Sequence, residues 1–138
     1  MPDRRLVYKK LEEIMKQLNY LKKLSKLSKK QLIIEETQRF LAERVMERLI
    51  GAAIDINMHL ISDISGEVPS TYFISFLELA RLKVLPVQFA HEIGKCTTVR
   101  NILVHEYQDI NLAKFYEAMQ SALKDFPRYV KYIEKFID

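Results

Sequence analysis

Glycine and proline are scarce in this sequence. It holds three glycines and four prolines in 138 residues, too few for the many turns of a β-sandwich or β-barrel. Hydrophobic residues make up 49% of the chain and charged residues 29%, which is the balance of a folded globular protein. A chain of this length holds one ordinary domain. The sequence therefore predicts a single all-α domain over residues 1–138.

Cysteines and clusters of metal-ligating residues are also scarce. Cys96 is the single cysteine, so the chain cannot form an intrachain disulfide, and one cysteine is a poor start for a zinc site. Asp, Glu and His residues do not gather at metal-ligand spacing. We therefore expect neither a metal nor a cofactor.

Long hydrophobic runs are absent. The longest apolar runs fall far short of the roughly 20 residues that a membrane span needs, and residues 1–10 lack the apolar core of a signal peptide. We therefore expect a cytoplasmic protein with no membrane partner.

Acidic residues are few at the N-terminal end. Residues 1–30 hold ten basic and three acidic side chains, a net charge of +7 in a chain whose total is +4. Apolar residues in this segment are spaced alternately by four and three positions: Val7, Leu11, Ile14, Leu18 and Leu21. This spacing predicts a basic first helix over about residues 3–26, packed along a neighbouring helix. The basic residues are either a solvated helix face or an attraction for nucleic acid or acidic lipid.

Caps and breaks indicate the helices that follow. Ser28 and Gln31 fit a capping box that starts a long helix reaching about residue 60. Turn-forming residues at 63–69 end it, and Ser70 caps a third helix.

Prolines indicate the boundaries in the second half of the chain. Pro86 begins a fourth helix that runs to about Val104, because proline suits a first helical turn and not a helix interior. Asp109 is expected to cap a fifth helix over about residues 110–124, and Pro127 to begin a short last one. The elements together predict an up-and-down bundle of five or six helices.

The polar residues that suit neither a cap nor a solvated face gather in residues 99–107. At 100° per residue, a helix that continues through Tyr107 presents Arg100, Asn101, His105 and Tyr107 on its polar side and docks its apolar side on the bundle. Arginine offers a planar, permanently charged fork for phosphate, and histidine donates and accepts a proton near neutral pH. These groups are the ones needed to cleave RNA without a metal.

Such cleavage needs more than one proton-transferring group. The 2′-hydroxyl attacks its own phosphate while one imidazole removes its proton, a second acid protonates the leaving 5′-oxygen, and a guanidinium stabilises the phosphate charge. One histidine can do one of these tasks in each step. We therefore expect a homodimer in which a second His105 and a second Arg100 complete a cleft between the subunits.

The string RNILVHEY, residues 100–107, resembles the signature of the HEPN superfamily. In that signature an arginine, usually followed by a polar residue, precedes a histidine by four to six positions, as Arg100 precedes His105 here. Tyr107, two places after the histidine, makes the string similar to that of the HepT toxins. The stretch ERLIGAAIDINMHL at residues 47–60, the tyrosine-bearing third helix and the hinge at residues 84–86 are similar to that family's layout.

The resemblance implies a dimeric helical bundle that acts as a metal-independent ribonuclease, the toxin of a toxin–antitoxin pair. Such toxins are paired with a MNT-type minimal nucleotidyltransferase, which neutralises them by transferring AMP groups to the motif tyrosine. Carried over by position, Arg100 and His105 are expected to be catalytic, Asn101 to support them in the catalytic set, and Tyr107 to be modified by AMP. A phenol bearing AMP places bulk and negative charge beside a phosphate-binding cleft.

Asp55 lies between two isoleucines on an otherwise apolar helix. A carboxylate there must be paired or must face a cleft. We expect Asp55 to orient Arg48 or Arg100 and so to support the site.

A second function stays open at this point. The same cleft suits a non-catalytic helical module that binds a nucleotide or regulates a partner nucleotidyltransferase. The sequence also does not choose between transfer RNA and messenger RNA as the substrate.

Overall fold

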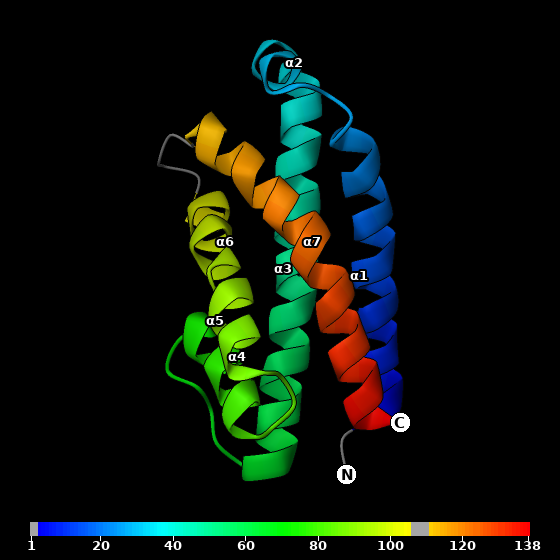
Figure 1. Cartoon of the computed structure of the whole chain (residues 1–138), viewed down its shortest axis with the longest axis vertical. Coiled ribbons are helices and arrows are strands. Elements are labelled where there is room, and N and C mark those ends of the chain that lie inside the picture. Colours follow the sequence, from blue (N-terminus) through cyan, green and yellow to red (C-terminus); the bar gives the residue numbers. More distant parts are fainter. Residues whose placement is uncertain (1–2, 106–110) are drawn as a thin grey trace.

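Seven helices make up the part of the chain that the structure describes, residues 3–105 and 111–138 of a computed structural model (Figure 1). They are α1 (Arg4–Leu24), α2 (Lys29–Ile34), α3 (Glu36–Ser65), α4 (Tyr72–Arg81), α5 (Val87–Gly94), α6 (Cys96–His105) and α7 (Leu112–Ile137). No strand occurs in these two ranges. The prediction of an all-α bundle is confirmed, although the described residues form seven helices and not the five or six expected.

The long helices α1, α3 and α7 run side by side, and α3 is the central one. Helix α1 packs on α3 and α7, helices α4 and α6 pack on α3, and α5 packs on α4. Figure 1 shows α1 and α6 on opposite sides of α3. The fold thus separates the basic N-terminal helix from the motif helix.

Helix α1 packs by the apolar face that its sequence spacing predicts. All five residues of that spacing, from Val7 to Leu21, are buried. Burying one such side chain contributes about 2 kcal/mol, so this face is sufficient to hold α1 on the bundle. At its start, the carboxylate of Asp3 accepts the backbone N–H of Arg5 at 3.0 Å, which caps the helix.

The capping box at Ser28 and Gln31 is present, but the long helix predicted from it is wrong. The chain leaves helical geometry at Glu35 (φ −92°, ψ 86°), which ends α2 after six residues and starts α3. Figure 1 shows α2 lying across the end of the bundle rather than along it. Leu32 of α2 is buried in the core.

Two further boundaries differ from the sequence expectation. Thr71, not Ser70, caps α4, and its hydroxyl accepts the N–H of Ile74 at 3.1 Å. The segment predicted as one helix from Pro86 to Val104 is two helices that meet at Lys95. Just before the bend, the ring of Phe73 packs closely on Gly94, because a Cβ at this position would lie 3.0 Å from the ring.

Helix α7 is continuous, so the predicted break at Pro127 is wrong. Pro127 lies inside the helix although proline there removes one hydrogen bond. Its neighbours Phe126 and Tyr129 are fully buried, and this packing holds the helix together across the missing bond. The predicted cap Asp109 lies outside the described residues. The described cap is Asn111, which accepts the N–H of Lys114 at 3.1 Å.

Candidate active site

Helix α6 carries three of the four motif residues. Its Leu103 and Thr97 are buried against the bundle, while Asn101 and His105 are exposed and Arg100 is half-buried. Leu103 confirms the expected docked side, and Asn101 and His105 confirm the expected outward side, whereas Arg100, expected to face outward with them, is only half-exposed. Tyr107 lies outside the described residues, so its place in the site stays a prediction.

The guanidinium of Arg100 stacks on an aromatic ring from another helix. Its central carbon lies 4.6 Å from the centre of the Tyr72 ring at the start of α4. A guanidinium over the face of a tyrosine is attracted by the ring quadrupole. Because its N–H groups point outward in its own plane, stacking leaves its edge available to bind a phosphate.

A chain of buried polar contacts fixes Tyr72 on the bundle. The Ser75 hydroxyl donates to the Tyr72 carbonyl oxygen at 2.6 Å and accepts from the Asn57 amide at 3.1 Å. The Tyr129 hydroxyl lies 2.5 Å from Asn57 Oδ1 and 3.1 Å from the Ala53 carbonyl oxygen. Asn57, Ser75 and Tyr129 are buried, where a broken hydrogen bond costs about 1–3 kcal/mol. The core therefore ties α3, α4 and α7 together beneath the Arg100 side chain.

Arg100 and His105 do not share one side of α6. Five residues of an α-helix turn by about 140° beyond a full turn and rise about 7.5 Å. Asn101 and His105, four residues apart, lie on nearly the same side. One chain thus offers the amide and the imidazole together, with the guanidinium turned toward α4.

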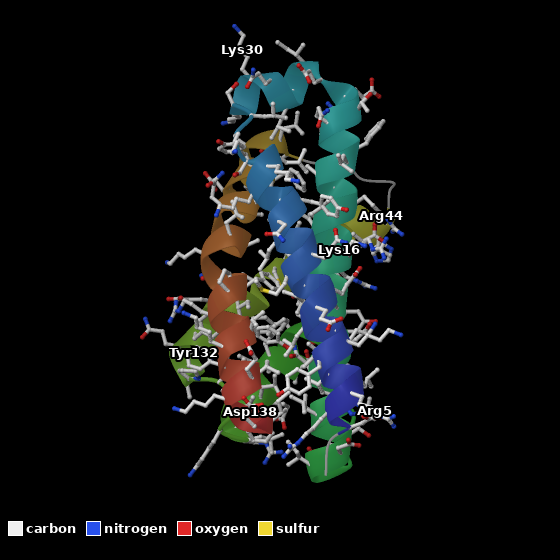
Figure 2. All side chains as sticks on the ribbon, turned by 90° about the vertical axis from the view of Figure 1, so that its right-hand side faces the viewer. Arg5, Lys16, Lys30, Arg44, Tyr132 and Asp138 are labelled. Atoms are coloured by element: carbon white, nitrogen blue, oxygen red, sulfur yellow. The ribbon has the colours of Figure 1, made fainter. Side chains whose placement is uncertain are left out.

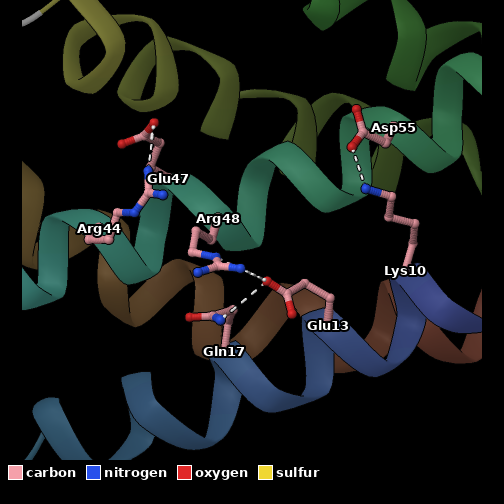
Figure 3. Close-up of polar contacts among 7 residues, drawn as sticks. All are labelled: Lys10, Glu13, Gln17, Arg44, Glu47, Arg48 and Asp55. Carbon is pink, nitrogen blue, oxygen red and sulfur yellow. Dashed lines mark hydrogen bonds and ion pairs between the residues drawn. The ribbon is translucent and has the colours of Figure 1, made fainter.

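The expected role of Asp55 is wrong. Asp55 binds Lys10 of α1, with Nζ 2.8 Å from Oδ2, and it contacts neither Arg48 nor Arg100 (Figure 3). Arg48 binds Glu13 of α1 at 3.0 Å. Asp55 and Arg48 of α3 thus both bind residues of α1. They fasten the N-terminal helix to α3.

A pocket lies between the start of α6 and α7, and none of Arg100, Asn101 and His105 lines it. It has a volume of about 350 Å³, and Cys96, Val99, Ser121 and Asp125 line it. Asp125 is buried, and its Oδ1 has no hydrogen-bond partner among the described residues. Burial raises the pKa of this carboxyl above its ordinary value, and the charge of Glu92 adds to the rise, while the charges of Lys124 and Arg128 oppose it.

Cys96 is not an activated nucleophile. Its thiol is partly covered by the core, and burial, followed by the charge of Asp125, raises its pKa well above the ordinary value. A thiol in such surroundings holds its proton at neutral pH.

The structure shows two residues that sequence reasoning did not find. These residues are Tyr72 and Asp125. Tyr72 lies 28 positions before Arg100 in the chain, so no local spacing links the two. A buried acid on the apolar face of α7 was a usable signal for Asp125, because such acids need a partner.

The described residues offer neither a metal site nor a membrane-spanning helix. No group of three or more His, Cys, Asp or Glu side chains within residues 3–105 and 111–138 is placed to hold a metal ion. Every helix in these ranges is too short or too polar to cross a membrane.

Comparison with protein families places the whole bundle in one group. The family model described as ribonuclease HepT-like matches residues 9–133. Among curated proteins, the chain is 33% identical over 132 residues to "tRNA nuclease HepT" of Aphanizomenon flos-aquae, covering 96% of this chain and 90% of that protein. It is 29% identical over 89 residues to "mRNA nuclease HepT" of Shewanella oneidensis, covering 64% and 67% of the two chains.

Solved structures show the same fold. A tri-AMPylated HEPN toxin of Shewanella oneidensis, solved in complex with MNT antitoxin, matches with a TM-score of 0.85 at 24% identity over 98% of this chain and 99% of that one. A toxin–antitoxin complex with AMP-PNP matches with a TM-score of 0.86 at 22% identity over 95% and 98% of the chains. The resemblance and the endoribonuclease class expected from the motif are thus confirmed, and this chain belongs to the HepT-like ribonuclease family.

Proposed function

We propose that this protein is the toxin of a toxin–antitoxin pair and cleaves RNA without a metal, through Arg100, Asn101 and His105 from two subunits. The observation that carries this proposal is the stacking of Arg100 on Tyr72, 4.6 Å from the ring centre. This contact pre-positions a phosphate-binding fork on the helix that also presents the imidazole. Holding charge in place before the reaction is a large source of catalysis.

The reaction is a transfer of the phosphate within one strand. The 2′-oxygen of a ribose attacks the neighbouring phosphorus as His105 of one subunit takes its proton. The bond from phosphorus to the 5′-oxygen then breaks, and a protonated His105 from the second subunit gives that oxygen a proton. The products are a 2′,3′-cyclic phosphate and a 5′-hydroxyl, so atoms and charges balance.

Two subunits supply what one helix cannot. Arg100 and His105 are turned about 140° apart on α6, so one chain does not aim both groups at one phosphodiester. A two-fold pair of α6 helices brings the Arg100 of each chain toward the His105 of its partner. The exposed side of α6, with Asn101 and His105, leaves room for such pairing.

The partner that switches the toxin off is a MNT-type nucleotidyltransferase. The phenol oxygen of Tyr107 attacks the α-phosphorus of ATP, pyrophosphate leaves, and an AMP group stays on the tyrosine. The charge and bulk of this group block the entry of another phosphate into the site. The AMPylated toxin solved with MNT antitoxin supports this step.

Transfer RNA is the proposed substrate, in the cytosol. The relative named a tRNA nuclease matches nearly the whole chain, whereas the one named an mRNA nuclease matches about two thirds of it. A structural neighbour from Bacillus subtilis is described as a cytosolic protein.

Replacement of His105 tests the proposal. His105→Ala removes the proposed proton carrier and should lower cleavage of total transfer RNA in EDTA by about 10²–10⁴-fold. His91→Ala is the matched control, because His91 is an exposed histidine on the neighbouring helix α5. Gel filtration and circular dichroism check that both variants keep the dimer and the helices.

Equal cleavage by the His105→Ala and His91→Ala variants would falsify the catalytic assignment. A starting protein that leaves RNA intact in EDTA but binds AMP tightly, with binding lost in Arg100→Ala, would instead favour the nucleotide-binding module.

A further inference from the structure

The turn between α1 and α2 gathers positive charge without any acid. From Ile14 to Ile34 the sequence has six lysines and no Asp or Glu. Five of them surround the turn and form what we name the lysine surface: Lys22, Lys23, Lys26, Lys29 and Lys30. All five are exposed. None of the ion pairs found within residues 3–105 and 111–138 includes one of them.

Helix stability does not explain the whole lysine surface. Lys22 and Lys23 lie in the last turn of α1, where cations are favourable. Lys29 and Lys30 lie in the first turn of α2, which has no acidic residue. Each cation there destabilises the helix by about 0.3–1 kcal/mol, because its charge opposes the helix dipole. Their placement is therefore unfavourable for the fold and points to a ligand.

The shape of the lysine surface suits a phosphate. A hollow of about 400 Å³ is lined by Asn19, Lys22, Lys23 and Lys26. Ammonium groups and an amide N–H are donors that a phosphate oxygen accepts. Tyr20, on the same helix, is 44% exposed, and an exposed ring beside lysines can stack on an unpaired base.

The lysine surface lies toward the end of the bundle at which the motif helix stops. Figure 1 shows α2 and the last turn of α1 in the upper half, where α6 also ends and α7 begins. Figure 2 shows Lys30 at the tip of this end and Lys16 midway along α1. A long polyanion that reaches His105 can therefore extend across α2 to the lysines.

We propose that the lysine surface binds the phosphate backbone of the RNA substrate outside the cleavage site. The inference rests on the proposed function, since it assumes that RNA is the substrate. The contact is one of charge and carries no sequence information. It increases the capture of a folded RNA and leaves the chemical step at α6 unchanged.

The test measures RNA binding as a function of salt in a cleavage-deficient background. Three lysines of the surface are neutralised together in the His105→Ala protein, as Lys22→Gln, Lys29→Gln and Lys30→Gln. The matched control neutralises three exposed lysines near the opposite end of the bundle, Lys9→Gln, Lys131→Gln and Lys135→Gln. Both triples change the net charge equally. Fluorescence anisotropy with labelled total transfer RNA gives the dissociation constant at several KCl concentrations.

The lysine-surface triple should bind transfer RNA at least about tenfold more weakly near 0.15 M salt. The slope of log K for RNA binding against log salt concentration should become shallower by about 2, since each phosphate contact contributes about 0.7–0.9 to that slope. The control triple should change affinity by less than about threefold through the general field. With His105 intact, the lysine-surface triple should raise KM for transfer RNA and keep kcat. Its melting temperature should not fall, because Lys29 and Lys30 do not support α2.

Several outcomes overturn the inference. Equal slopes in the two triples would show that only net charge matters. Unchanged RNA binding together with lost binding to phosphatidylglycerol vesicles would assign the surface to a membrane instead. No RNA binding by the starting protein would also reject it. These results are distinct from failure of the proposed function, which shows as unchanged cleavage by the His105→Ala protein.

Discussion

The two sides of α3 hold their charges in opposite ways. On the α1 side, Arg48 binds Glu13 and Asp55 binds Lys10, each pair within 3.0 Å. On the α6 side, Arg100 lies on the ring of Tyr72 and is in none of the ion pairs of the described residues. A carboxylate neutralises a guanidinium, whereas a ring orients it and leaves its charge in place. The first side joins helices through ion pairs, and the second leaves the charge of Arg100 without a carboxylate partner among the described residues.

The largest expected difference between the two sides is in RNA cleavage, when Arg100 or Arg48 is replaced by alanine. Arg100→Ala should lower kcat/KM for transfer RNA by about 10²–10³-fold, because it removes a positioned charge from the transition state. Arg48→Ala should leave kcat/KM within about threefold and cost less than about 1 kcal/mol of stability, as exposed ion pairs do. Cleavage rates and urea unfolding of both variants are the measurements. Similar losses of activity in the two would show that general positive charge, not the position of Arg100, matters.

The features of α1 and α6 that depend on neighbouring residues in the sequence could be predicted from it. The alternating spacing of Val7 to Leu21 predicted the buried face of α1, and the motif spacing predicted an outward polar side on α6. The breaks at Glu35 and Lys95 were missed because neither position carries a proline or glycine that would mark the end of a helix.

Long-range pairs were beyond sequence reasoning for the same physical reason. Asp55 pairs with a residue 45 positions away, and Arg100 with Tyr72, so neither contact leaves a periodic signal. Pro127 was misassigned as a helix start because buried neighbours outweigh its local preference.

Changing Tyr72 tests whether the ring itself positions Arg100. Tyr72→Leu keeps an apolar side chain but removes the π face, and kcat should fall about 5- to 30-fold, the range of a cation–π contact of about 1–2 kcal/mol. Tyr72→Phe retains the ring and should keep kcat within about twofold. The readout is kcat against KM in single-turnover and steady-state cleavage. A loss in Tyr72→Phe as large as in Tyr72→Leu would assign the effect to the hydroxyl and not to stacking.

The smallest expected effect is the change in stability when a carboxylate on either side of α3, Asp125 or Asp55, is removed. Burial raises the pKa of Asp125 in the folded state, so the folded protein holds this proton at a pH where the unfolded chain has lost it. Stability is then reduced as the pH rises through the window from the unfolded pKa, about 3.9, to the raised folded value. Asp125→Asn removes the charge and should raise stability at pH 7 by about 1 kcal/mol, with little change near pH 3.

The matched control for Asp125 is Asp55→Asn. Asp55 is exposed and paired with Lys10, so its removal should leave stability unchanged or lower it by less than about 1 kcal/mol. Thermal unfolding of both variants between pH 3 and pH 7 measures the difference. A gain of the same sign in both variants would mean that net charge controls stability. A gain in stability that is confined to Asp125→Asn and grows as the pH rises means that the buried acid Asp125 lowers the stability of the fold. The acid on the α1 side, Asp55, has no such effect because it is paired with Lys10.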